Sequence, residues 1–283
     1  MQSCTNNAYA KINLSLDILG TLDNGYHSLK MVIQSISLYD VVTIKKAESG
    51  ITITTNLPYL PTNENNICYK AAVKFFEYTN IKSGIIIDIS KRIPVGAGLG
   101  GGSSNAASVL KTLNKLFDTK LSLKELCNIG ATIGADVPFC VLGGTRLAEG
   151  FGEKLSPLPK MPKYTILLVK PSFSLSTKAI YDLYDKQENI NHPDTDKLIH
   201  GLKNNSIYEI CEGMGNVLEQ TVISEYGIIQ EIKDELLNLG AINAQMSGSG
   251  PTVFGIFDSF EQAQSAKKNL WGKYKTVYIC SPV

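Results

Sequence analysis

The sequence predicts an α+β fold. Strand-like and helix-like segments are mixed in both halves of the chain, without the steady alternation of a doubly wound parallel sheet. The chain has 283 residues, which is enough for two modest domains. Three prolines in residues 154–163 interrupt regular structure. We therefore expect two domains, residues 1–156 and 157–283.

The first part of the chain reads mainly as strands. Residues 9–19 alternate as a half-buried strand. Its apolar face holds Ile12, Leu14, Leu16 and Ile18, and its polar face holds Lys11, Asn13, Ser15 and Asp17. Further strand-like runs cover residues 31–38, 40–44 and 51–55. Residues 66–77 then have helical periodicity, with Asn65 or Asn66 as the N-cap.

A glycine-rich loop follows between a predicted strand (85–89) and a predicted helix (106–116). Its glycines are Gly96, Gly98, Gly100, Gly101 and Gly102. Ser103, Ser104 and Asn105 are N-cap residue types, so we expect the helix to begin there. Unpaired N–H groups at a helix start attract phosphate, and glycine lets a ligand approach the backbone closely. This arrangement predicts a phosphate-binding loop.

Other glycine motifs fit this loop less well. Residues 96–101 match the dinucleotide pattern G-x-G-x-x-G, but that fingerprint needs an acidic residue on a second strand roughly 20 residues on. Residues 116–120 look instead like a helix end and a turn. A P-loop needs Gly-Lys-Ser/Thr, and no lysine lies between Arg92 and Lys111. A glycine-rich turn without a ligand is the structural alternative, which the folding entropy of so many glycines disfavours.

The remaining elements are shorter and still mixed. Residues 122–134 read as a helix, residues 164–169 as a strand and residues 177–184 as a helix. The polar residues 186–196 predict an exposed loop. The other predicted elements are a helix at 228–237 and strands at 252–257 and 276–280.

Composition excludes several classes of protein. The net charge of +1 does not favour nucleic acid or an anionic membrane as a partner. The six cysteines include no C-x-x-C pair, so we expect no zinc site or disulfide framework, and a reducing compartment. Residues 1–8 lack the basic start and apolar core of a signal peptide, and no apolar run approaches the ~20 residues of a membrane span. We therefore expect a soluble cytoplasmic protein.

Polar residues outside the loop leave alternatives open. Asp136, between small residues and Pro138, is either a helix cap or a positioned catalytic group. Lys11 alone is more typical of a solvated surface. Residues 246–251 form a second glycine-serine turn, which is either a plain tight turn or part of a site. Residues 25–27 could present an aromatic ring and an imidazole to a ligand.

Together these segments resemble one enzyme family. Residues 94–104 look like the signature of the kinases named for galactokinase, homoserine kinase, mevalonate kinase and phosphomevalonate kinase, the GHMP kinases. Residues 246–252 match the family's third, C-terminal glycine motif. Segments resembling one branch of the family extend over nearly the whole chain and are residues 10–14, 23–27, 34–40, 134–139 and 176–181. Asn105 stands where the family often has aspartate, and both residues can cap a helix.

The resemblance implies a two-domain α+β fold with ATP and substrate in the cleft between the domains, residues 1–156 forming the ATP-binding domain and residues 157–283 completing the substrate site. It implies transfer of the γ-phosphate of ATP to the tertiary 2-hydroxyl of a cytidine diphosphate-linked methylerythritol, with Mg²⁺ bridging the ATP phosphates. The expected partner is this small molecule, without nucleic acid or membrane, for a monomer or homodimer.

The resemblance also implies a role for individual residues. Lys11 and Asp136 match the catalytic pair. Tyr26 and Tyr181 match rings that sandwich the cytosine, His27 matches the group at its edge, and Asn13 faces the methylerythritol hydroxyls. Ser104 reaches a phosphate oxygen or the metal. The implied nucleotide-binding loop is Pro94, Val95, Gly96, Ala97, Gly98, Leu99, Gly100, Gly101, Gly102, Ser103 and Ser104.

Three rival functions remain. Another kinase of the same family, for homoserine or a mevalonate-pathway substrate, would lack the cytosine-sandwich residues. A regulatory protein that kept the nucleotide pocket would lack the acid or the lysine, and both are present. A dinucleotide-dependent dehydrogenase would be stabilised by NAD, whereas a kinase would be stabilised by ATP.

Overall fold

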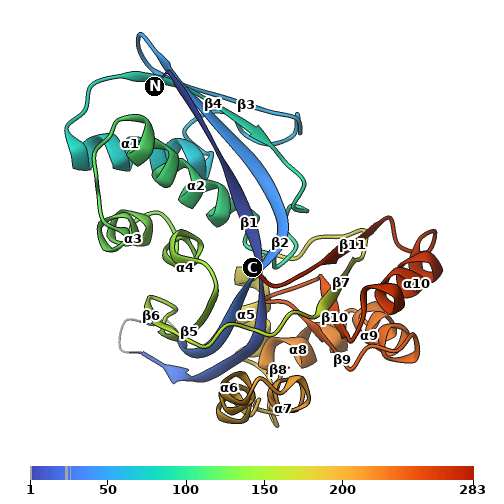
Figure 1. Ribbon diagram of the computed structural model, residues 1–283. Coiled ribbons are helices and arrows are strands. Elements are labelled where there is room, and N and C mark those ends of the chain that lie inside the picture. Colours follow the sequence, from blue (N-terminus) through green and yellow to red (C-terminus); the bar gives the residue numbers. More distant parts are fainter. Residues whose placement is uncertain (1, 23–24, 26) are drawn as a thin grey trace. The chain divides into compact units, whose positions relative to one another are not determined.

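The computed structural model describes residues 2–22, 25 and 27–283, and it confirms the α+β class (Figure 1). Its strands are β1 (Ser3–Thr21), β2 (His27–Ala47), β3 (Ile51–Thr55), β4 (Gly84–Ser90), β5 (Thr145–Gly150), β6 (Lys154–Pro157), β7 (Thr165–Lys170), β8 (Gly215–Asn216), β9 (Asn243–Met246), β10 (Val253–Phe257) and β11 (Thr276–Cys280). Its helices are α1 (Ile67–Thr79), α2 (Gly101–Leu116), α3 (Leu123–Ala131), α4 (Val137–Leu142), α5 (Thr177–Tyr184), α6 (Thr195–Asn204), α7 (Ile207–Gly213), α8 (Val217–Glu225), α9 (Ile228–Asn238) and α10 (Phe260–Leu270).

Contacts divide the chain into two compact units. The first unit contains residues 2–10, Leu38–Pro94 and Gly100–Gly143, and the second contains Lys11–Ser37, Val95–Leu99 and Gly144–Val283. Both units are therefore discontinuous in sequence, with β1, β2 and the glycine loop contributing to each. The division into residues 1–156 and 157–283 stays a prediction.

The first unit is a sheet covered by helices. β4 pairs parallel with β3 and antiparallel with residues 41–47 of β2. Figure 1 shows α1 and α2 beside the strands, and α3 and α4 pack against these two helices. Their apolar side chains form one core with the strands, in which Phe75, Ile85 and Ile87 are fully buried. Burial of this apolar surface stabilises the unit.

The second unit contains two groups of strands. β5 pairs with residues 29–34 of β2 and with β6, while β8 pairs parallel with β1 through Ser15 and Leu16. A separate four-stranded sheet has the order β11-β7-β10-β9. α9 packs on β9 and β10, and α10 packs on β11 and β7 (Figure 1). No helix in the described part of the chain is long and apolar enough to cross a bilayer.

Most predicted elements form, and the differences are local. Residues 31–38 and 40–44 belong to one strand, β2, because Tyr39 continues the extended backbone between them. Residues 154–157, within the proline-rich stretch, form β6 rather than an irregular linker; a proline is tolerated at a strand end on a sheet edge. The segment 186–196 is a loop up to Asp194, the N-cap of α6, which begins at Thr195.

Burial of the polar face of β1 contradicts the half-buried strand expected there. Lys11 is 6% exposed and Asn13 is 1% exposed, and Ser15 and Asp17 are also buried. Both faces of this strand are covered because the chain after residue 143 packs onto the part of β1 that belongs to the second unit. A solvated surface position for Lys11 is therefore excluded.

Candidate active site

The glycine loop has a backbone that side chains would disturb. Gly96, Gly98 and Gly100 have φ values of 60°, 73° and 67°. These left-handed conformations favour glycine. At Gly98 space is limiting as well, since a Cβ there would lie 2.1 Å from the carbonyl oxygen of Ser247. Glycine at position 98 therefore permits the close approach of two backbone segments.

Helix α2 begins earlier than predicted. Gly100 is the N-cap, and the Ser104 amide already donates to the Gly100 carbonyl at 2.8 Å. The expected caps Ser103, Ser104 and Asn105 lie inside the helix because glycines 100–102 accommodate the turn that precedes them. The first-turn amides are consequently those of residues 101–103. Amides at this position have no partner within a helix and are suited to bind an anion.

The side chains of Ser104 and Asn105 have other partners in the first unit. The Ser104 hydroxyl donates to the Tyr9 carbonyl at 2.5 Å. Asn105 donates from Nδ2 to Asp40 at 2.8 Å and accepts from Lys91 Nζ at 2.9 Å. These bonds attach the start of α2 to β1 and β2.

Asp40 is the centre of a buried polar cluster that the sequence did not reveal. Its carboxylate is fully buried and also accepts from Lys91 Nζ at 2.5 Å and from the amides of Arg92 and Ile93 at 2.6 and 2.8 Å. The cluster therefore fixes the chain where it enters the glycine loop. A buried carboxylate needs such donors to offset its lost hydration.

In the second unit three distant motifs meet. The Lys11 amide donates to the Leu99 carbonyl at 3.0 Å, which pairs β1 with the glycine loop. Ser247 Oγ donates to the Gly98 carbonyl at 3.0 Å and accepts from the Asn13 amide at 3.4 Å. Lys11 Nζ donates to Asn13 Oδ1 at 2.7 Å. The structure thus brings Lys11, Asn13 and residues 98–99 together with the second glycine-serine turn.

That turn, residues 246–251, is shaped by its own backbone. The Gly250 amide donates to the Ser247 carbonyl at 3.0 Å, and Gly248 and Gly250 have φ values of 57° and 78°. A Cβ on Gly248 would stand 3.3 Å from Lys11 Nζ and from Asn13 Oδ1. The turn is part of this polar cluster rather than an isolated connection.

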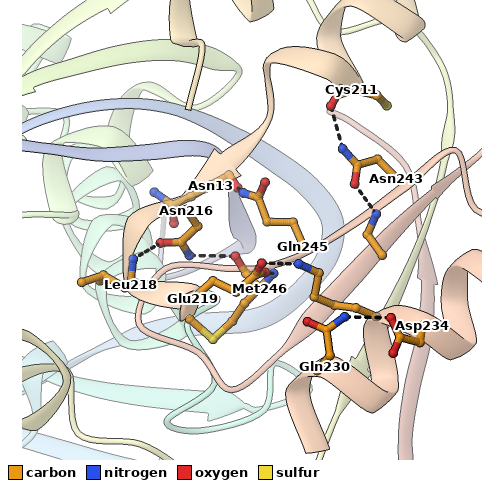
Figure 2. Close-up of polar contacts among 12 residues, drawn as sticks. Asn13, Cys211, Asn216, Leu218, Glu219, Gln230, Asp234, Asn243, Gln245 and Met246 are labelled. Atoms are coloured by element: carbon orange, nitrogen blue, oxygen red, sulfur yellow. Dashed lines mark hydrogen bonds and ion pairs between the residues drawn. The ribbon is translucent and has the colours of Figure 1, made fainter. Parts of the chain in front are cut away.

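Figure 2 shows polar side chains that surround Met246, the first residue of the turn. Asn216, the residue before α8, donates from Nδ2 to the carbonyls of Met246 and Gly248 at 2.9 and 2.8 Å. Glu219 accepts from the Met246 amide at 2.6 Å, and Gln245 donates to the Asn13 carbonyl at 3.1 Å. These three polar side chains connect α8 and β9 to the motifs above.

A second cluster in the same unit is aromatic. The His27 and Tyr181 rings are 5.0 Å apart between centroids, and His27 Nε2 lies 2.7 Å from Asp185 Oδ1. Tyr184 approaches His27 edge-on at 6.2 Å. The structure therefore brings together two of the residues expected to contact cytosine. Tyr26, the third, lies outside the described residues.

Asp136 belongs to the first unit, where it precedes α4. Within the described helix Val137–Leu142, no hydrogen bond from its side chain caps the first turn. The far end of α4 is held by Lys111, which donates to the carbonyls of Cys140 and Val141 at 3.2 and 3.4 Å. Burial lowers the pKa of Lys111. The helix that presents Asp136 is thus attached to α2.

The described side chains offer no preformed metal centre. Among residues 2–22, 25 and 27–283, no group of three or more His, Cys, Asp or Glu is arranged to hold an ion. Mg²⁺ in kinases is held by one or two side chains together with substrate phosphates, so a dedicated cluster is not required. Because Ser104 gives its proton to Tyr9, its oxygen presents lone pairs, which suits a cation more than a phosphate.

The residues that the sequence did not reveal mostly hold other parts of the site in place through hydrogen bonds. Asp40 lies in a strand-like run and Asn216 in a region without a diagnostic motif. An asparagine followed three residues later by glutamate is a helix-start pattern that could have revealed Asn216 and Glu219 as a cap. Their contacts with the distant turn depend on tertiary packing, which local sequence does not specify.

Comparison with known proteins identifies matching families. The model described as "GHMP kinases N terminal domain" matches residues 66–144, and that described as "GHMP kinases C terminal" matches residues 198–275. A 4-diphosphocytidyl-2-C-methyl-D-erythritol kinase of Clostridium botulinum is 49% identical, over 96% of this chain and 97% of the relative. The enzyme of the same name from Clostridium beijerinckii is 46% identical over the same shares.

Solved structures give a consistent picture. A crystal structure of 4-(cytidine 5'-diphospho)-2C-methyl-D-erythritol kinase matches with a TM-score of 0.85 and 29% identity, covering 99% of each chain. Homoserine kinase from Cytophaga hutchinsonii matches with a TM-score of 0.80 at 22% identity, covering 99% of this chain and 94% of its own. The second match concerns the fold alone.

Proposed function

The chain belongs to the GHMP kinase family, and on that premise we propose that it transfers the γ-phosphate of ATP to the 2-hydroxyl of 4-diphosphocytidyl-2-C-methyl-D-erythritol, a step of non-mevalonate isoprenoid synthesis. The observation that carries the proposal is the meeting of Lys11 and Asn13 with Gly98 and Ser247 in the second unit. This contact places the buried Lys11 and the amide of Asn13 beside the proposed phosphate loop.

Nucleotide binding follows from the loop and the helix after it. Phosphoryl transfer requires in-line positioning and neutralisation of spreading negative charge. The first-turn amides of α2, together with residues 96–100, supply oriented donors for phosphate oxygens. Within the second unit, the Ser247–Gly98 bond fixes residue 98 of this segment. Within the first unit, the Asp40 cluster fixes the chain at residues 92–93.

Proton transfer is assigned to Asp136, with Lys11 as the cation that favours the developing alkoxide. A tertiary hydroxyl is a weak nucleophile until it loses its proton, and a carboxylate can accept that proton. Lys11 is buried, so its ammonium acts in surroundings where a charge has a strong effect. We propose these roles for the two residues, and the mutations below test them.

Choice of acceptor is assigned to the aromatic cluster. Tyr181 and Tyr26 offer rings for the cytosine faces, and His27 offers a hydrogen-bonding group for its edge. Asp185 fixes the orientation of His27 through its contact with Nε2. Asn13 is suited to the methylerythritol hydroxyls because an amide side chain can both donate and accept.

Mg²⁺ would be held by the ATP phosphates and the Ser104 oxygen. When bound, it supplies charge neutralisation at the β- and γ-phosphates. We further propose that the enzyme acts in the cytoplasm as a monomer or homodimer, without nucleic acid or membrane as a partner. The absence of a C-x-x-C pair among the six cysteines suits a reducing compartment.

The experiment that tests this function measures ADP release by purified protein with ATP and Mg²⁺ across four acceptors. These are 4-diphosphocytidyl-2-C-methyl-D-erythritol, methylerythritol phosphate, mevalonate and homoserine. We expect turnover with the cytidylyl compound alone. Turnover with another acceptor would contradict the assigned acceptor pocket. ATP binding without turnover of any acceptor would favour a regulatory protein.

A further inference from the structure

We propose that Asn216 is a positioning residue for phosphoryl transfer, acting through the turn at residues 246–251. This inference rests on the proposed function. Asn216 is 8% exposed and lies outside the motif segments by which the sequence resembles the family. Its side chain donates to backbone carbonyls of the turn, and Figure 2 shows its contact with Met246.

The Asn216 amide group makes two hydrogen bonds to the turn. Asn216 Nδ2 reaches two carbonyls of the turn, that of its first residue, Met246, and that of Gly248. One amide group thus spans the segment that carries Ser247. Ser247 in turn bonds to Gly98 and Asn13. A shift of the turn would therefore be transmitted to the phosphate loop and to β1.

Asn216 also lies in a strand that pairs with β1. In β8, Asn216 pairs parallel with Leu16 of β1, the strand that carries Lys11 and Asn13. Its side chain reaches β9 and the turn. The same residue thus fixes the spacing between the strand of the catalytic lysine and the turn packed on that lysine.

Helix α8 makes a second contact with the turn through Glu219. Glu219 accepts from the Met246 amide at 2.6 Å and forms an ion pair with Lys233 of α9. Met246 is therefore held at both its amide and its carbonyl by the first turn of α8. Two hydrogen bonds to one peptide segment restrict both its rotation and its translation. Catalysis requires reacting groups to be positioned this closely.

Asn216 also caps α8, since its Oδ1 accepts from the Leu218 amide at 3.0 Å. A test must separate the loss of this N-cap from the loss of the two hydrogen bonds that Nδ2 donates. Serine is an equally good N-cap but its side chain is too short to bond both carbonyls. Asn216→Ser therefore keeps the cap and removes the anchor, whereas Asn216→Ala removes both. Ser259→Ala, which removes the cap of α10 in the same unit, is the matched control.

Two measurements on the full chain decide the inference. Hydrogen exchange of the Ser247–Gly250 amides should be at least tenfold faster in Asn216→Ser and unchanged in Ser259→Ala. With the cytidylyl acceptor, kcat should fall about tenfold or more in Asn216→Ser, while the acceptor KM changes by less than about threefold. Asn216→Ala should share the kinetic defect and have a lower Tm.

Unchanged exchange in Asn216→Ser would overturn the anchor. Faster exchange with wild-type kcat would show that the anchor does not position the reaction. An equal loss of kcat in Ser259→Ala would assign the effect to stability of the unit. Failure of the wild-type protein to turn over the acceptor would instead contradict the proposed function, and the exchange measurement would still decide the anchor.

Discussion

The hydroxyl of Ser247 donates to the carbonyl of Gly98 at 3.0 Å, although 149 residues separate them. The Ser247 carbonyl lies 2.1 Å from the point that a Gly98 Cβ would occupy. Two glycine-rich turns are therefore in backbone contact, and neither can move without the other. This contact is the physical basis for treating them as parts of one site.

Gly98→Ala should abolish most activity and destabilise the protein. The left-handed φ of 73° costs an alanine about 1–3 kcal/mol, and overlap with Ser247 adds to that cost. Gly227→Ala is the control, because in the described part of the chain no atom other than those of its sequence neighbours lies within 4 Å of the added Cβ. Urea unfolding and ADP release measure both effects. Wild-type stability in Gly98→Ala would show that the two turns separate readily.

Asp40→Ala should be among the most destabilising changes in the first unit. It removes the acceptor for Lys91, Asn105 and two amides and leaves a buried ammonium without its carboxylate, which typically costs about 3–5 kcal/mol. Asp88→Asn, at an exposed residue of β4, should change stability by less than about 0.5 kcal/mol. Chemical denaturation compares the two. A loss below about 1 kcal/mol for Asp40→Ala would contradict a structural role for the cluster.

Asp136→Asn should lower kcat by about 10²–10⁴-fold with little change in Tm. Lys11→Met should lower it as well, because it removes the buried cation. If the two act on one proton transfer, the double variant will lose much less than the product of the single losses. Strictly multiplicative losses would mean that the residues act independently. Near wild-type kcat in Asp136→Asn would make Asp136 structural.

Tyr181→Ala should raise KM for the cytidylyl acceptor and leave KM for ATP nearly unchanged, as should Tyr26→Ala. Stacking on a base contributes about 1–3 kcal/mol, which corresponds to about 5- to 150-fold in KM. Tyr208→Ala, at an exposed tyrosine of α7, is the control. A rise in KM for ATP instead would mean that the aromatic cluster binds the nucleotide.

The contribution of Cys68 to stability should fall in alkaline solution. Burial raises the pKa of this thiol from 9.0 to about 12. Below pH 9 the thiol is protonated in both states and its contribution is complete. Between pH 9 and 12 the unfolded chain loses the proton first, so stability falls by ~1.4 kcal/mol per pH unit. The unfolding free energies of wild type and Cys68→Ala at pH 8 and 10 measure this; an unchanged difference would contradict it.

Sequence patterns predicted the elements whose apolar residues repeat regularly. β3 and α5 have the predicted limits, and Asn66 caps α1 as one of two candidates. The start of α2 was misplaced because Ser104 and Asn105 look like caps but bond to Tyr9, Lys91 and Asp40. Local propensity cannot show that a side chain is used by a distant segment.

Long-range contacts also limited what the sequence could predict about the site. Lys11 has the sequence surroundings of a surface residue, and only packing of the second unit buries it. The motifs at residues 94–104 and 246–251 were visible because glycine and serine are unusual at such density. Gln245 was not, since a single amide residue carries no local signal, and for Asn216 the local pattern indicates only a helix cap. Tertiary contacts decide which of these residues support the site.

The central claim is that this chain phosphorylates a tertiary hydroxyl of a cytidylyl acceptor. The most direct measurement is the proton-coupled phosphorus NMR spectrum of the product made from ATP, Mg²⁺ and 4-diphosphocytidyl-2-C-methyl-D-erythritol. The carbon bearing the 2-hydroxyl has no hydrogen, so the new phosphomonoester should give one singlet, in equal amount to ADP. A doublet or triplet would place the phosphate on a secondary or primary hydroxyl, and no new monoester signal would contradict the claim altogether.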